Sequence, residues 1–135
     1  MSGKMPGWVV HLAVAAALLA ATSAVAQSEF PSGHELLLDV SPLKGSKRVP
    51  GLTIETDGTA TIDMWCNSAK GQLVVAADTI TIITGPMTER QCPADRAAGD
   101  EDILAALKEV SNWRREGDVL VLTGTTTMRF RLTTN

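Results

Sequence analysis

The sequence predicts a single α+β domain, built as an antiparallel, twisted sheet or partly closed barrel of about seven strands with one helix packed on it. Three observations support this. Short runs of residues alternate between apolar and polar side chains, as half-buried strands do. Turn signals such as Asp57-Gly58 separate these runs. Only residues 100–113 repeat their apolar side chains at helical spacing.

The N-terminus predicts a removable export signal. Lys4 precedes an apolar run from Trp8 to Ala21, and Ala24-Val25-Ala26 is a small-residue cleavage motif. This is the layout of a secretory signal peptide over residues 1–26. A membrane anchor is the alternative, but the run is shorter than the roughly 20 apolar residues that a span needs. We therefore expect a periplasmic or secreted protein without a stable membrane span, with a lead-in over 27–34 and a domain over 35–135.

The first strands follow the lead-in. Leu36 to Val40 predicts a strand, and a basic loop with Lys44, Lys47 and Arg48 comes after it. Residues 52–56 and 59–65 alternate on either side of Asp57-Gly58, which predicts a tight hairpin with a positive φ at Gly58. A Gly58→Val substitution should therefore destabilise the hairpin.

The middle of the chain predicts a turn, a second hairpin and the helix. Residues 67–71 are expected to turn, with Asn67 and Gly71 at its two ends, and strands over 72–76 and 79–84 follow. Residues 87–99 read as a loop. The predicted helix over 100–113 buries a stripe that includes Leu107, and Leu107→Ala should cost roughly 2–5 kcal/mol. Its first turn would hold Asp100, Glu101 and Asp102, which suit the positive end of the helix dipole.

A third hairpin closes the domain. Strands are expected over 119–123 and 127–133. Met128, Phe130 and Leu132 would face inward, and Arg129 and Arg131 outward. A chain of this length can bury a core without a metal.

Composition excludes several classes of protein. Apolar residues make up 44% and charged residues 20% of the chain, as in globular proteins. A net charge of −3 argues against nucleic acid or an anionic membrane as the main partner. No catalytic, cofactor-binding or metal-binding constellation is present in the sequence. We expect a non-enzymatic, monomeric protein that binds an unidentified envelope protein or a small ligand.

The two cysteines, Cys66 and Cys92, allow two interpretations. In an oxidising compartment they are expected to pair. The alternative is a thiol-based redox or metal-handling protein that uses both cysteines and His34. In that case Arg90 and Arg96, which lie near Cys92 in the sequence, would activate its thiol.

Three further surfaces are candidates for binding. Trp65 could be an exposed stacking platform, although packing under a loop or the helix is favoured. Lys44, Lys47 and Arg48 could contact an anionic group or form a solvated loop. A barrel interior could hold an apolar small molecule, and its lining would be Ile62, Ile80, Ile82, Val121 and Phe130.

The ordered motifs resemble the META domain family, which includes HslJ-like heat-shock proteins of bacteria. The resemblance lies in Pro50-Gly51-Leu52-Thr53-Ile54, in Cys66-Asn67-Ser68-Ala69-Lys70-Gly71 and in Thr88-Glu89-Arg90-Gln91-Cys92-Pro93. It covers about residues 35–133. The resemblance implies an envelope domain rich in antiparallel strands, linked to the heat-shock response and without accepted catalytic residues. It also makes the proximity of the two cysteines plausible.

Overall fold

The computed structural model describes residues 2–4, 7 and 29–134. Most of the predicted signal peptide, with its cleavage site after Ala26, lies outside these residues. Within the described part of the chain, no helix combines the length and the apolar character that a membrane crossing requires.

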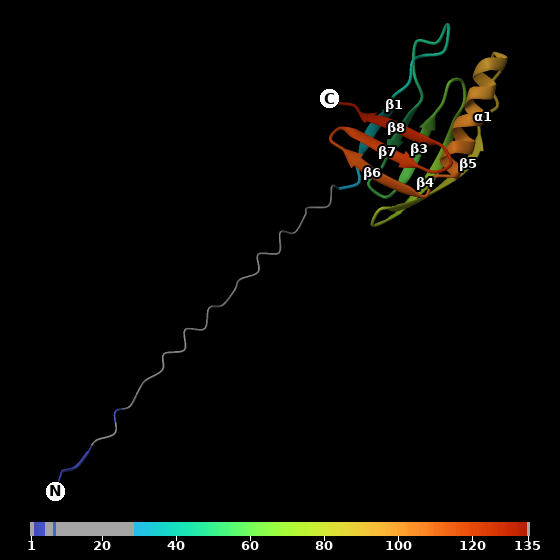
Figure 1. Ribbon diagram of the computed structural model, residues 1–135. Coiled ribbons are helices and arrows are strands. Elements are labelled where there is room, and N and C mark those ends of the chain that lie inside the picture. Colours follow the sequence, from blue (N-terminus) through green and yellow to red (C-terminus); the bar gives the residue numbers. More distant parts are fainter. Residues whose placement is uncertain (1, 5–6, 8–28, 135) are drawn as a thin grey trace.

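Strands that follow one another in sequence pair antiparallel, and the last strand pairs with the first, so the sheet closes into a barrel (Figure 1). The strands are β1 (His34–Leu38), β2 (Gly51–Ile54), β3 (Thr59–Asp63), β4 (Ser68–Ala76), β5 (Thr79–Met87), β6 (Asn112–Glu116), β7 (Val119–Thr123) and β8 (Thr127–Leu132). The helix α1 (Ala94–Lys108) joins β5 to β6 and lies beside β5. The α+β class and the antiparallel sheet are confirmed, but the barrel is closed and has eight strands.

The helix begins and ends earlier than predicted. Pro93 caps its N-terminus, where proline costs nothing because the first turn has no partner for its missing N–H. Asp100, Glu101 and Asp102 therefore lie in the middle of α1, and the prediction that they form its first turn is wrong. Residues 112 and 113, predicted as the end of the helix, instead begin β6, the strand that the sequence did not predict.

The connection between β3 and β4 also differs from the prediction. The chain turns over residues 64–67, where the Met64 N–H donates to the Asn67 carbonyl oxygen at 2.9 Å. Ser68 already pairs with Asp63, and Gly71 pairs with Ala60. The predicted turn over 67–71 is therefore wrong, because only Asn67 belongs to the turn and Gly71 lies inside β4.

The predicted hairpins are otherwise confirmed. Gly58 has a φ of +86° at the β2–β3 turn, and a Cβ at that position would lie 2.7 Å from the Leu73 carbonyl oxygen. Ala77 turns the β4–β5 hairpin with a φ of +53°. Met128 and Phe130 are buried and Arg129 and Arg131 are exposed, as the alternation in β8 predicts.

The core fills the barrel and extends to the helix. β5 and β6 share only the pair Thr79 and Asn112, and α1 runs back along β5 beside this opening. Leu107 of α1 is completely buried and belongs to the same core cluster as the inward strand residues, as its place in the apolar stripe predicts. Phe30 packs on Trp113 with ring centroids 5.0 Å apart, so part of the predicted lead-in contacts the core.

Val121 was predicted to line the interior, and this is wrong. It pairs with Arg114 on β6 and with Arg129 on β8, whose side chains face outward, while Leu120 and Leu122 take the inward positions. Val121 is nevertheless fully buried. Glu116 binds both arginines, so their aliphatic stems are held over the valine.

Candidate functional site

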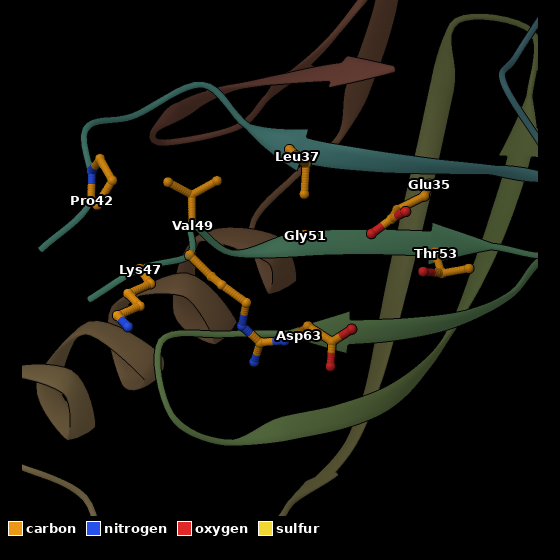
Figure 2. Close-up of a pocket in the computed structure, with 9 residues that line it drawn as sticks. Glu35, Leu37, Pro42, Lys47, Val49, Gly51, Thr53 and Asp63 are labelled. Atoms are coloured by element: carbon orange, nitrogen blue, oxygen red, sulfur yellow. The ribbon is translucent and has the colours of Figure 1, made fainter. Parts of the chain in front are cut away.

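A groove of about 400 Å³ lies on the outer face of β1, β2 and β3, under the loop that joins β1 to β2 (Figure 2). Its residues come from the strands and from this loop: Glu35, Leu37, Pro42, Lys47, Arg48, Val49, Gly51, Thr53 and Asp63. The groove thus includes two of the three basic residues that the sequence analysis singled out. Lys44 is exposed in the same loop and does not line the groove.

Strand register places the floor of the groove in two rows. Leu37, Gly51 and Asp63 are direct neighbours on β1, β2 and β3. Two residues further along the same strands, Glu35 on β1 is the direct neighbour of Thr53 on β2. Alternation in the strands directs these residues outward because the intervening residues fill the core.

Gly51 makes the groove deep in its centre. A Cβ on Gly51 would lie 2.9 Å from the Leu36 carbonyl oxygen and 3.2 Å from Cδ2 of Leu37. Any side chain there would therefore both strain the β1–β2 pairing and fill the floor. This position lies in the Pro-Gly-Leu-Thr-Ile segment, so a part of the sequence noted for family resemblance forms the base of the hollow.

Hydrogen bonds within the covering loop hold its shape. The Ser46 N–H donates to the Leu43 carbonyl oxygen at 2.8 Å, and the Ser46 hydroxyl donates to the Arg48 carbonyl oxygen at 2.9 Å. The Leu38 N–H donates to the Pro50 carbonyl oxygen and ties the two ends of the loop together. Gly45, with a φ of +80°, lies against the guanidinium of Arg96 on α1.

The charged side chains of the groove form no ion pairs with other residues that the structure describes. In the described part of the chain, the ion pairs join Glu116 to Arg114 and to Arg129, and Asp39 to Arg131. Lys47 and Arg48 on the loop, and Glu35 and Asp63 on the strands, take no part in them. The groove therefore offers two cations and two carboxylates to a ligand.

A second hollow of about 290 Å³ lies between α1, the end of β1 and β8. Asp39 and Arg129 line it, but Asp39 binds Arg131 at 3.2 Å and Arg129 binds Glu116 at 3.1 Å. Of the charged residues that line this hollow, only Asp102 takes no part in the ion pairs of the described residues, so the hollow is the weaker candidate for recognition of a ligand with charges of both signs.

The two cysteines form a disulfide, and their positions are separated by 26 in the sequence. The bond links the turn after β3 to the segment before α1. Asn67 joins the same two segments: its Nδ2 donates to Sγ of Cys92 at 3.2 Å, and its Oδ1 accepts from the Thr88 hydroxyl and the Arg90 N–H. The Asn67 side chain is thus a structural bridge beside the disulfide.

Asp100 is the residue that sequence reasoning missed. Its carboxylate is fully buried and accepts the backbone N–H groups of Trp65 at 2.7 Å, Cys66 at 3.2 Å and Asn67 at 2.7 Å. A single carboxylate therefore accepts the hydrogen bonds of three successive backbone N–H groups in the turn between β3 and β4. The signal for this role was an acid seven residues after a proline that can start a helix, because this spacing places the acid in the second turn rather than at the helix end.

Trp65 packs on the helix, as favoured over the exposed platform. Gly99 on α1 leaves the space that the Trp65 indole occupies, because a Cβ on this residue would lie 2.6 Å from Cδ1 of the indole. Trp65 thus belongs to the same structural cluster as Asp100 and the disulfide, and the structure does not bring it to the groove. His34 is exposed at the start of β1.

The residues expected to line an internal ligand site pack against one another instead. Ile62, Ile80, Ile82 and Phe130 are buried members of the core cluster. Both hollows described above lie on the outside of the barrel.

Comparison with known proteins supports the fold. A family model for the META domain matches residues 37–135. An NMR structure of a protein from Burkholderia xenovorans superposes with a TM-score of 0.63 at 15% identity, covering 77% of this chain and 84% of that chain. A second NMR structure superposes with a TM-score of 0.60 at 20% identity, covering 75% of this chain and 90% of that chain. No curated protein matches the sequence.

Proposed function

Because the chain belongs to the META domain family, we propose that it is an exported, non-enzymatic domain that maintains the cell envelope under stress by binding a partner or ligand in the β1–β2–β3 groove. The observation that carries this proposal is the set of uncompensated charges around an apolar floor in that groove. Surfaces that bind small ligands combine a concave apolar region with a few polar groups in the same way.

Three features support export and a binding role. The N-terminal segment has the layout of a secretory signal. A disulfide persists in oxidising compartments such as the periplasm or the extracellular space. The groove lies on paired strands and under an internally bonded loop, so little order has to be created when a ligand binds.

Complementation under envelope stress tests the proposal. A strain that lacks the protein is expected to be sensitive to heat or to envelope-active antibiotics, and the native chain should restore resistance. The variant Arg48→Gln/Asp63→Asn removes one groove charge of each sign and should fail to restore it. The variant Lys44→Gln/Glu101→Gln makes the same changes on exposed residues outside the groove and should restore resistance fully. Equal rescue by both variants would contradict a role for the groove.

A redox role is the second candidate, favoured by the surroundings of Cys92. Its sulfur accepts a hydrogen bond from Asn67 and lies just before the N-terminus of α1, and both features would stabilise a thiolate after reduction. Intact mass of the exported protein, with and without alkylation, separates the two functions. A chain that starts at Gln27 and takes up no label supports the binding role, whereas two labels without prior reduction would favour the redox role.

A further inference from the structure

We propose that the groove binds short peptides that carry both a free amino group and a free carboxylate. Lys47 and Arg48 receive the carboxylate, and Glu35 and Asp63 receive the ammonium group. This inference rests on the proposed function, since it names the class of ligand that the same groove takes.

The charged side chains of the groove balance one another in number. The groove contains equal numbers of cations and carboxylates, and none of them forms an ion pair with another of the residues that the structure describes. A purely anionic ligand would satisfy the cations but would lie near two carboxylates of its own sign, and a purely cationic ligand has the opposite problem. A zwitterion meets both sets of groups with complementary charge.

One cation and one carboxylate lie toward opposite ends of the groove. Lys47 belongs to the loop at one end of the groove, and Glu35 lies beyond Gly51 toward the other end, with Asp63 along the β3 side (Figure 2). Glu35 is paired with Thr53, two residues beyond Gly51, which is about 7 Å along a strand. A ligand that reaches from Lys47 to Glu35 therefore has to extend along the groove, as a short peptide can.

The middle of the groove is apolar and narrow. Leu37, with 37% of its surface exposed, faces Val49 across the space that Gly51 leaves open. A small apolar side chain would cover this exposed leucine and fit where a Cβ of the protein is absent. The Thr53 hydroxyl supplies a polar group next to the floor.

The peptide would not add a strand to the sheet. β2 is paired on both sides, with β1 and with β3, and β1 is also paired with β8. Backbone groups under the groove are therefore already hydrogen-bonded, and recognition rests on side chains and on the ligand's two ends. Affinity is accordingly expected in the micromolar to millimolar range, and selectivity should depend on the termini rather than on a long sequence.

An NMR titration of the isotopically labelled, exported protein tests the inference. The probes are trialanine, N-acetyl-trialanine, trialanine amide and inorganic phosphate. Trialanine is expected to shift the amide signals of Leu37, Val49 and Gly51 in a saturable way. Blocking either end should weaken binding about two- to fivefold, the effect of losing one exposed ion pair.

Variants assign each end of the peptide to its partners. Asp63→Asn should weaken trialanine but leave N-acetyl-trialanine unchanged, because the blocked amino group makes no use of the carboxylate. Arg48→Gln should weaken trialanine but leave the amide unchanged. Lys44→Gln and Glu101→Gln are the matched controls and should bind all probes as the native protein does. The amide spectrum of each variant shows directly that it is folded.

Three results would overturn the inference. They are no saturable shift with trialanine in the millimolar range, equal binding of blocked and free peptides, or shifts with phosphate that match those with trialanine. Each of these leaves the proposed function intact if Arg48→Gln/Asp63→Asn still fails to restore stress resistance, because the groove would then bind another class of ligand. Full rescue by that variant would instead remove the proposed function itself.

Discussion

Asp100 organises the turn that carries the first cysteine. One buried carboxylate accepts hydrogen bonds from three successive backbone N–H groups. A helix side chain thus accepts the hydrogen bonds that a neighbouring strand accepts elsewhere in the sheet. The disulfide and the Asn67 bridge then attach the same turn to the segment before α1. The cysteine-containing motif therefore joins the β3–β4 turn to the segment before α1.

Substitution of Asp100 should be severe. Asp100→Asn replaces one acceptor oxygen by an amide group whose hydrogens face a backbone N–H. Each buried donor left without a partner costs about 1–3 kcal/mol, so we expect a loss of about 3–5 kcal/mol in the free energy of unfolding. Urea denaturation measures it. Asp102→Asn, an exposed position on the same helix, should change stability by less than about 0.5 kcal/mol. Equal behaviour of the two variants would refute the role of Asp100.

Gly99 should respond in the opposite way to an ordinary helix glycine. Gly99→Ala would normally stabilise a helix by up to about 1 kcal/mol. Here the new methyl group meets the Trp65 indole, and overpacking of this kind costs about 1–3 kcal/mol. We therefore expect a lower denaturation midpoint. In a Trp65→Ala background the same change should become stabilising, and a penalty that persists there would place its cause elsewhere.

At the scale of the elements, the strands with regular alternation were predictable and β6 was not. Asn112–Glu116 contains one apolar residue, Trp113, whose indole N–H donates to the Ala77 carbonyl oxygen at the end of the barrel. The apolar stripe of the helix continues to Val110, which is buried although it lies beyond α1. A prediction from local periodicity therefore continues the helix into residues that form β6. Only the pairing of β6 with β7 shows where the helix ends and the strand begins.

The outer face of β6, β7 and β8 predicts a dependence of stability on pH. Hydrogen bonds from Arg114, and then from Arg129, hold the pKa of Glu116 below its ordinary value of 4.5. The ionised form is favoured in the folded state, so its contribution is complete above the unfolded pKa and is lost as the pH falls through the folded pKa. Urea midpoints measured across this acidic range should fall less steeply for Glu116→Gln than for the native protein.

NMR titration of the Glu116 carboxyl group checks the cause directly. Arg114→Gln should raise its pKa more than Arg129→Gln does, since the bond to Arg114 is the larger influence and is also the shorter, at 2.8 Å against 3.1 Å. Arg131→Gln is the control on the same face, because Arg131 binds Asp39 instead. A pKa that does not change in Arg114→Gln would contradict the network.

At the scale of the whole molecule, the disulfide ties the barrel to its helix. A crosslink with this separation in sequence stabilises a fold by about 3–4 kcal/mol through the entropy of the unfolded chain. Cys66→Ser/Cys92→Ser should lower the free energy of unfolding by about this amount while the barrel still folds, because Asp100 and Asn67 join the same segments. The native protein measured with reductant should match the variant, and a variant as stable as the oxidised protein would contradict the role.

The sequence by itself determined the class of the fold, the hairpins, the inward face of β8 and the family. These depend on alternation and turn chemistry, which are local. The tertiary structure decided the closure of the barrel, the place of β6, the outward direction of Val121 and the partners of Asp100. It also decided that Lys47 and Arg48 share a groove with Glu35 and Asp63. Each of these depends on strand register and on contacts between distant segments, because a side chain's neighbours across a sheet are set by pairing and not by its position along the chain.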